Sequence, residues 1–234
     1  MNLLLASTST VHGNPYLGYF DGALEEFFSG VKELIFIPYA RPGGITHDEY
    51  TQKAAERFLE LGIKTKGLHE YDDVQSAIEN AEAIFTGGGN TFVLVDKLYE
   101  MMLHNTIKKS VEGGCKYMGT SAGTNIAGIT INNTNDMPIV YPPGFLGLDL
   151  VPFNFNPHYL DPDPTSTHKG ETRETRIKEF HSKSDIPVLG IREGTWIEGN
   201  DDGLFLRGEH TARVFKGSIA PYEINTGTKL EFYK

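Results

Sequence analysis

The sequence predicts a single α/β domain over residues 1–234, with a mostly parallel central sheet flanked by helices. Short apolar runs of strand character alternate with segments of helical period through the first half of the chain. Parallel strands need crossover connections, usually helices, so this alternation indicates a sheet covered on both faces. The sequence contains no internal repeat, low-complexity tract or interdomain linker, which favours one domain.

The expected strands of the first half are short runs rich in aliphatic, β-branched or aromatic residues. In chain order they are 2–6, 33–40, 63–68, 81–86 and 116–119. Helices are expected where apolar side chains recur every three or four residues, at 17–28, 48–61 and 91–103, with a short acidic helix before Ala81. The helix over 48–61 is expected to stop at Gly62, because a helix end favours a residue in the left-handed conformation.

The second half of the chain has a different character. Prolines, asparagines and aspartates are frequent from about residue 129 to residue 169, which predicts a loop-rich stretch. Helical period returns at 171–181, and strands are expected at 186–191 and near the carboxyl terminus.

Composition excludes several classes of protein. With 39% hydrophobic and 22% charged residues, the chain matches globular averages, so disorder and coiled coil are poor interpretations. The single cysteine, Cys115, cannot close an intramolecular disulfide and does not suffice for a zinc–thiolate site. A formal net charge of −10 argues against non-specific binding to nucleic acid or to anionic membranes.

No segment of the sequence predicts export or membrane insertion. The amino-terminal run MNLLLASTST has no Lys or Arg before its apolar residues and is too short to cross a bilayer. A reduced, aqueous compartment, most simply the cytoplasm, is therefore expected.

Gly119-Thr120-Ser121-Ala122-Gly123 has the G-x-S-x-G pattern of a nucleophile elbow, between an expected strand and a helical stretch. Such a serine sits on a tight turn that tolerates only small neighbours, and the following helix aims N–H groups at the same space. Ser121 is thus the candidate nucleophile, with an ordinary Gly/Ser turn as the alternative. The usual α/β-hydrolase arrangement fits poorly, because little chain other than loop follows Ser121.

A second glycine-rich turn, Gly87-Gly88-Gly89-Asn90-Thr91, follows another expected strand. Consecutive glycines let the backbone approach a ligand and expose N–H donors to an anion or oxyanion. The turn lacks the Lys-Ser/Thr of a P-loop and the spacing of a dinucleotide fingerprint, so nucleotide binding is weakly supported. Both turns are expected at the carboxyl ends of parallel strands, where they could face one crevice; a plain tight turn is the alternative.

Ser121 needs a base, because a free serine hydroxyl is a weak nucleophile at neutral pH. His158 is the first candidate, since it ends the run Asn154–His158 just after a proline, and His168 is the next. Three other histidines lie in helical or charged contexts and are expected to be solvated: His69, His104 and His181.

The histidine needs an orienting carboxylate, for which Asp136 and Glu193 are both candidates. Asp136 belongs to a polar segment, whereas Glu193 follows an expected strand and would lie at its carboxyl end. The sequence has no H-x-x-x-H pair or other metal-ligand cluster, so neither a metallopeptidase nor a cofactor is expected.

Taken together, these motifs resemble the peptidase E family of α-aspartyl dipeptidases, from end to end of the chain. That family consists of serine peptidases with a fold similar to class I glutamine amidotransferases, and it cleaves dipeptides that carry a free amino-terminal aspartate. The resemblance is carried by Asp48-Glu49-Tyr50, Gly87–Phe92, Ser121-Ala122-Gly123, Thr134–Val140, Asn156-Pro157-His158 and His168–Glu174.

The resemblance implies a catalytic triad. Ser121 matches the family's nucleophile and His158 its base. Asp136 matches the acid usually assigned, and Glu193 matches a glutamate proposed in its place, so both carboxylates stay candidates.

The resemblance also implies groups that bind the substrate. Gly89 and Ala122 match the positions whose N–H groups form the oxyanion hole, and Arg173 matches the arginine that binds the substrate's aspartate side chain. A guanidinium suits that role because it pairs with a carboxylate bidentately. By its residues alone, Arg173 would equally fit the charged face of a surface helix.

The expected partner is a small Asp-X peptide, with no nucleic acid or membrane, and a homodimer is an open expectation. Two alternative functions differ in chemistry. One is a relative acting on another aspartyl amide, such as an isoaspartyl or polyaspartate derivative, and the other is a non-catalytic small-molecule binder on the same fold.

Overall fold

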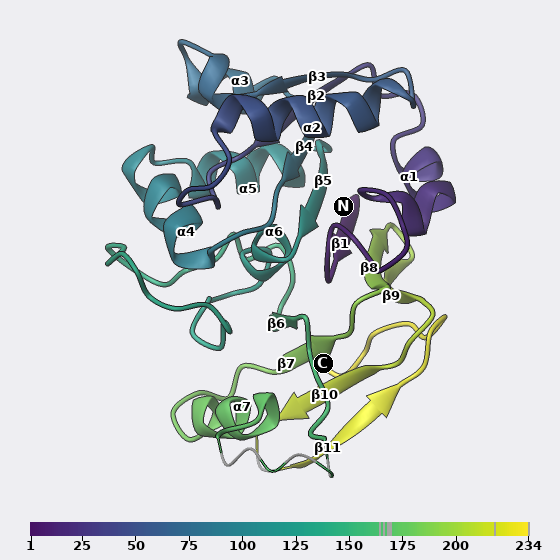
Figure 1. Ribbon diagram of the computed structural model, residues 1–234, viewed down its shortest axis with the longest axis vertical. Coiled ribbons are helices and arrows are strands. Elements are labelled where there is room, and N and C mark those ends of the chain that lie inside the picture. Colours follow the sequence, from purple (N-terminus) through teal and green to yellow (C-terminus); the bar gives the residue numbers. More distant parts are fainter. Residues whose placement is uncertain (164, 166, 168–169, 218, 234) are drawn as a thin grey trace.

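The computed structural model describes residues 1–163, 165, 167, 170–217 and 219–233. Its centre is a seven-stranded sheet with a four-stranded sheet beside it (Figure 1). In the large sheet five neighbouring strands pair in parallel, and the last two strands are joined to them by two antiparallel pairings. In spatial order they are β3 (Lys64–Gly67), β2 (Glu33–Ile37), β4 (Ala83–Thr86), β5 (Lys116–Thr120), β1 (Leu3–Ala6), β8 (Thr195–Asn200) and β9 (Gly203–Gly208). The expected mostly parallel central sheet is confirmed.

The small sheet was only partly foreseen. Its strands are, in spatial order, β11 (Ile219–Ile224), β10 (Ala212–Lys216), β7 (Val188–Ile191) and β6 (Asn154–Pro157). β6 lies inside the stretch expected to be loop, and it runs parallel to β7. Asparagine and proline make β6 look like a turn in sequence, but buried partners on β7 complete its hydrogen bonds.

Helices flank the large sheet, and one packs on the small sheet (Figure 1). They are η1 (Gly18–Phe20), α1 (Asp21–Phe27), α2 (His47–Leu59), η2 (Leu68–Glu70), α3 (Val74–Glu79), α4 (Thr91–Glu100), α5 (His104–Glu112), α6 (Ala122–Asn125) and α7 (Arg173–His181). The helix expected over 17–28 is confirmed in part: residues 18–27 are helical, but a 3₁₀ turn precedes a short α1. Gly62 has a φ of 74° just beyond α2, as expected. No helix in the described part of the chain is long and apolar enough to cross a bilayer.

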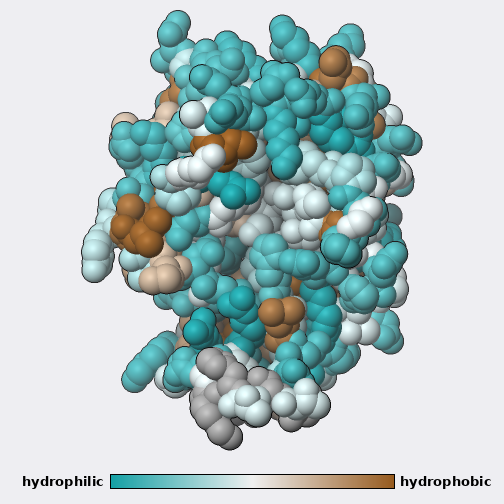
Figure 2. Space-filling view, in the orientation of Figure 1, coloured by the Kyte–Doolittle hydropathy of each residue, from teal (hydrophilic) through white to brown (hydrophobic). Residues whose placement is uncertain are grey.

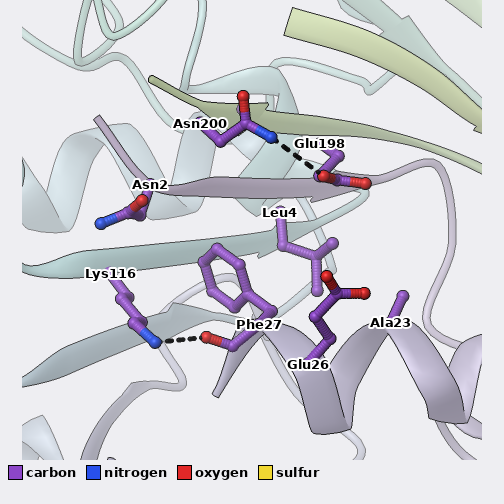
Figure 3. A pocket seen from close by; sticks show the side chains of 9 residues that line it. Asn2, Leu4, Ala23, Glu26, Phe27, Lys116, Glu198 and Asn200 are labelled. Carbon is purple, nitrogen blue, oxygen red and sulfur yellow. Dashed lines mark hydrogen bonds between the residues drawn. The ribbon is translucent and has the colours of Figure 1, made fainter. Parts of the chain in front are cut away.

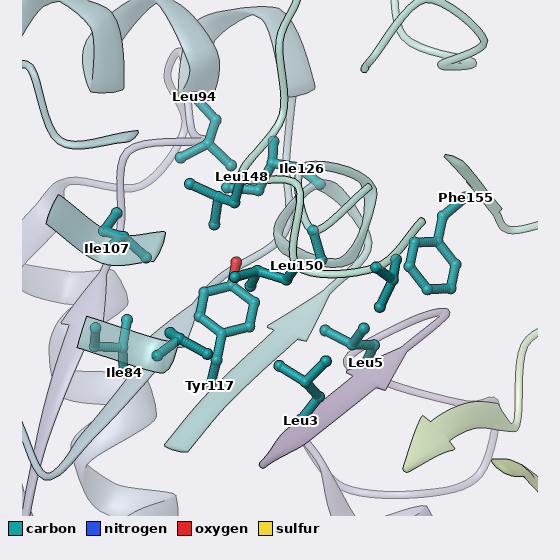
Figure 4. Close-up of a cluster of buried hydrophobic side chains, with 14 of the residues drawn as sticks. Leu3, Leu5, Ile84, Leu94, Ile107, Tyr117, Ile126, Leu148, Leu150 and Phe155 are labelled. Atoms are coloured by element: carbon teal, nitrogen blue, oxygen red, sulfur yellow. The ribbon is translucent and has the colours of Figure 1, made fainter. Parts of the chain in front are cut away.

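Each face of the large sheet buries its own apolar cluster, because side chains alternate along a strand. Leu3 and Leu5 belong to one cluster, and Leu4 and Ala6 to the other. Figure 4 shows the first cluster, where β1, β4 and β5 meet α4, α5 and α6. This cluster also contains Phe155 of the small sheet, so one core continues across both sheets.

A cavity of about 200 Å³ lies at the amino ends of the parallel strands (Figure 3). Its lining includes Asn2, which precedes β1, and Lys116, which begins β5, together with Glu198 and Asn200 of β8. Lys116 Nζ donates to the Phe27 carbonyl beside the cavity. Ser121 follows the opposite, carboxyl end of β5, so this cavity is separate from the candidate site.

Candidate active site

Ser121 lies in the turn between β5 and α6, as a nucleophile elbow requires. Its φ of 52° and ψ of −110° are strained for an L-residue, and such strain concentrates at functional sites. The Ser121 N–H donates to the carbonyl of Ala6, at 3.2 Å. A Cβ on Gly123 would lie 2.1 Å from the carbonyl oxygen of Thr86, so only glycine lets the turn pack this closely.

The Gly87–Asn90 turn packs directly against this elbow. A Cβ on Gly88 would lie 3.0 Å from Ser121 Cβ, and the carbonyl of Gly88 accepts a hydrogen bond from the buried Tyr50 hydroxyl at 3.2 Å. Gly89 has a φ of 149°, and a Cβ there would meet the Ala40 carbonyl at 2.2 Å. The two glycine-containing turns therefore converge on Ser121.

His158 contacts both Ser121 and Glu193. Its Nε2 lies 2.9 Å from Ser121 Oγ, and its Nδ1 lies 2.7 Å from Glu193 Oε1. Pro157 of β6 pairs with Ile191 of β7 in parallel register, so the residues after these two strands emerge side by side. With Nδ1–H donating to Glu193, Nε2 is left to accept the Ser121 hydroxyl hydrogen.

Ser7 connects the two sheets behind this histidine. It follows β1, is fully buried, and its Oγ accepts the His158 N–H at 2.9 Å while donating to the Ile191 carbonyl at 2.9 Å. His158 has a φ of 53°, an unfavourable backbone conformation that this hydrogen bond helps to hold. Ser7 thus ties the backbone of His158 to Ile191, which lies two residues before Glu193 in the sequence.

Asp136 lies elsewhere in the site. Its Oδ2 accepts the N–H of Thr91, the first residue of α4, at 2.7 Å, and lies 3.4 Å from the Thr134 hydroxyl. Within the described residues it makes no hydrogen bond or ion pair with His158. Of the two candidate carboxylates, the structure brings Glu193 to the histidine and Asp136 to the start of α4.

The two N–H groups expected to hold an oxyanion flank Ser121. Gly89 belongs to the turn packed on Ser121, and Ala122 is the first residue of α6. Among the described residues, neither N–H donates to a protein acceptor. Unpaired backbone donors next to a nucleophile are the groups that could stabilise a developing negative charge.

Arg173 is the first residue of α7, and it lines a surface hollow of about 510 Å³ together with the segment that follows His158. The guanidinium is partly buried, yet it has no ion pair or hydrogen bond within the described residues. Burial lowers the pKa of Arg173, nearby Arg176 lowers it further, and Asp136 raises it. A partly buried, unpaired guanidinium is a ready site for a carboxylate.

Charged side chains brace the loop that carries Glu193. Arg192 makes paired hydrogen bonds with Asp161, at 2.8 Å, and with Glu223 of β11, at 2.9 and 3.1 Å. Burial alone would raise the pKa of Glu223, but hydrogen bonds from Arg192, Thr211 and Arg213 lower it to about 2. Arg213 also pairs with Glu174 of α7 at 3.1 Å, which links this network to the helix of Arg173.

The remaining histidines differ from expectation. His69, His104 and His181 are partly buried and not simply solvated. His69 contacts Asp48 at 2.8 Å, His104 packs on Tyr99, and His181 contacts the Ile186 carbonyl at 3.0 Å. His168, the second candidate base, lies outside the described residues. Among the residues described, no three His, Cys, Asp or Glu side chains are arranged to hold a metal ion.

Two supporting residues, Ser7 and Tyr50, were missed by the sequence reasoning. Ser7 directly follows the first expected strand, a position at the same sheet edge as Ser121, and this placement was an available signal. Tyr50 stands in a motif of the resemblance, but its contact with Gly88 joins residues 38 positions apart and has no local signature.

The chain is similar to known peptidases over almost its whole length. Residues 3–207 match the family model described as "Peptidase family S51". Peptidase E of Streptomyces coelicolor is 48% identical over 98% of this chain and 93% of its own, and the "Probable alpha-aspartyl dipeptidase" of Drosophila melanogaster is 46% identical over 99% and 96%. A peptidase from an acI-B1 actinobacterium shares the fold, with a TM-score of 0.70 at 20% identity over 99% and 96% of the two chains. The chain therefore belongs to peptidase family S51, a family of serine-type peptidases.

Proposed function

We propose that this enzyme is an α-aspartyl dipeptidase that hydrolyses Asp-X dipeptides through a triad of Ser121, His158 and Glu193. The observation that carries the proposal is the unbroken hydrogen-bonded series from Ser121 Oγ through the His158 ring to Glu193, at 2.9 and 2.7 Å. The names of the Streptomyces and Drosophila relatives support the same activity.

The reaction is acyl transfer in two halves. Ser121 Oγ attacks the carbonyl carbon of the amino-terminal aspartate while His158 Nε2 takes the hydroxyl proton, and Glu193 stabilises the imidazolium. The N–H groups of Gly89 and Ala122 hold the oxyanion. His158 then gives its proton to the leaving amine as the peptide bond breaks. A water molecule, deprotonated by His158, hydrolyses the aspartyl ester and restores Ser121.

Arg173 accounts for the aspartate preference in this proposal. Its guanidinium is partly buried and has no ion pair or hydrogen bond to any residue that the structure describes, which supports bidentate binding of the substrate's side-chain carboxylate. An asparagine substrate would present an amide with its own N–H donors to this guanidinium, and would leave the charge uncompensated.

Replacing Ser121 with alanine tests the proposed chemistry. Hydrolysis of Asp-Leu should fall below about 1% of the native rate, since removing a triad member costs several orders of magnitude. Unchanged thermal unfolding would show that the fold is intact. Turnover above that level by the purified variant would contradict the mechanism. Native protein that cleaves β-linked Asp-Leu and not α-linked Asp-Leu would favour the isoaspartyl alternative.

We also propose a cytoplasmic location and a homodimer. A single buried thiol, Cys115, suits a reducing compartment.

The face seen in Figure 2 is largely hydrophilic, with apolar side chains in small separate areas. Between 137 and 146, however, Met137, Ile139 and Tyr141 are exposed, and exposed apolar groups in one segment favour association. Light scattering of the purified protein distinguishes a mass near 26 kDa from one twice as large.

A further inference from the structure

We infer that Asp136 binds the α-ammonium group of the substrate and is not the acid of the triad. The inference rests on the proposed function and adds to it the group that makes a free amino terminus necessary.

The segment that carries Asp136 is tied to both sides of the catalytic pair. On one side, Asn90 Nδ2 donates to the Met137 carbonyl at 2.9 Å, and Asn90 directly follows the glycines packed on Ser121. On the other side, Asn135 exchanges side-chain hydrogen bonds with Asn156, at 3.0 and 3.2 Å, and Asn135 Nδ2 donates to the Pro157 carbonyl at 3.0 Å. Asp136 is therefore held between the oxyanion turn and the residue that precedes His158.

The carboxylate of Asp136 keeps one oxygen available. Oδ2 accepts the Thr91 N–H at 2.7 Å, while Oδ1 has no hydrogen-bond partner in the described part of the chain. The residue is partly exposed, so a ligand can reach it. An ionised carboxylate fixed through one oxygen can accept a hydrogen bond from an ammonium group through the other.

Asp136 and Arg173 have opposite charges and lie close enough to interact electrostatically, yet they form no ion pair within the described residues. An amino-terminal aspartate carries the complementary pair, because only Cα and Cβ separate its ammonium nitrogen from its side-chain carboxyl group. One substrate residue can thus place its carboxylate on Arg173 and its ammonium on Asp136. Lengthening the acyl chain or blocking the nitrogen would break one of the two contacts.

The His158 ring has no remaining site for Asp136. Nε2 is engaged with Ser121 and Nδ1 with Glu193, so both ring nitrogens are occupied. A triad role for Asp136 would require the histidine to exchange its partner. A substrate role leaves the hydrogen bonds of His158 to Ser121 and Glu193 in place.

The test compares two ligands that differ only in the ammonium group. Asp-Leu and succinyl-Leu share the same acyl chain and leaving group, and succinyl-Leu lacks the nitrogen. Binding of each is measured by calorimetry in a Ser121→Ala background, where neither is turned over. Asp136→Asn keeps a side-chain acceptor for the Thr91 N–H, so the fold should be retained. Asp96→Asn, which removes a carboxylate on the same helix α4 that Asp136 caps, is the matched control.

We expect Asp136→Asn to weaken binding of Asp-Leu about tenfold or more, the scale of a lost hydrogen bond between charged groups. Binding of succinyl-Leu should stay within about twofold, and Asp96→Asn should change neither. Equal weakening of both ligands by Asp136→Asn would overturn the inference, and so would no weakening of Asp-Leu.

A second measurement needs no substitution at Asp136. The pKa of a peptide amino terminus is about 8, so above this pH the ammonium group of Asp-Leu loses its charge and affinity for Asp-Leu should fall. Succinyl-Leu has no ammonium group, so the pH dependence of its affinity shows the part that comes from titrating groups of the protein. Those groups near the ligand are His158, Glu193, Asp136, Arg173 and Arg176. Parallel pH profiles for the two ligands would contradict ammonium binding. Failure of the native enzyme to hydrolyse Asp-Leu would instead contradict the proposed function itself.

Discussion

His158 Nδ1 lies 2.7 Å from Glu193 Oε1, and this contact follows from the pairing of two short strands. Because β6 and β7 run parallel in register, the residues just beyond them must emerge at the same edge of the small sheet. Ser121 reaches the same place from the large sheet, where its elbow follows β5. The catalytic series therefore spans the junction of the two sheets. Because the packing of the sheets sets the position of Ser121 relative to His158, we expect a change in this packing to lower kcat.

Replacing Arg173 with methionine should remove the preference for aspartate. The loss of a charge-assisted pair should raise KM for Asp-Leu. It should also lower kcat/KM, by an amount that corresponds to about 2–4 kcal/mol of lost transition-state binding. Steady-state kinetics with Asp-Leu and Asn-Leu measure the preference directly. Lys178→Met, on the same helix and in an exposed ion pair with Glu174, is the control and should leave kcat/KM nearly unchanged. Native protein that cleaves Asn-Leu as well as Asp-Leu would show that the role of Arg173 is misassigned.

Replacing Ser7 with alanine should lower kcat more than it changes KM. The change leaves the buried N–H of His158 and the carbonyl of Ile191 without their partner, at a cost on the order of 1–3 kcal/mol in the free energy of unfolding. The backbone of His158 then loses the hydrogen bond that positions it, which lowers kcat. The proposed binding of the substrate's carboxylate by Arg173 is unaffected, so KM changes less. Ser7→Cys, a close match in size with a weak donor and acceptor, should recover part of kcat. A folded Ser7→Ala enzyme with native kcat would show that this hydroxyl does not position His158.

Ionised Glu223 should make the thermal stability of the fold depend on pH in the acid range. Its pKa in the folded protein, about 2, lies below the usual value of about 4.3, so the ionised form stabilises the fold above that usual value. This contribution is lost as the pH falls from about 4 toward 2. Glu223→Gln should therefore lower Tm at pH 7, and the difference from the native protein should shrink over that acid range. A Tm difference that stays constant from pH 7 to pH 2.5 would contradict this pairing.

The large sheet and the elbow could be predicted from sequence because their signals are local. Apolar runs such as Leu3–Ala6 and the glycines around Ser121 reflect constraints within a few residues of each other. The same holds for Gly62, whose positive φ follows the end of α2 at Leu59. Even the meeting of the two glycine-containing turns followed from the edge rule for parallel strands.

The choice of acid could not be predicted, because it depends on strand pairing between distant segments. Asp136 belongs to a polar segment and Glu193 follows an expected strand, but neither has a local feature that points to His158. β6 itself was hidden, since Asn154 and Asn156 are poor strand formers whose side chains are satisfied by residues of the 130–135 segment. The antiparallel strands β8 and β9 extend the sheet in a way that the parallel pattern did not imply.

The kcat of a Glu193→Gln variant on Asp-Leu is the most direct test of the role of Glu193 as the acid of the triad. Glutamine can donate its own N–H to Nδ1, which favours the tautomer that cannot take the Ser121 proton, so kcat should fall on the order of 10³–10⁴-fold with little change in KM. Asp136→Asn should by contrast act mainly on KM. A Glu193→Gln enzyme that keeps kcat within about tenfold of the native value, in a protein that folds normally, would contradict the Ser121–His158–Glu193 triad.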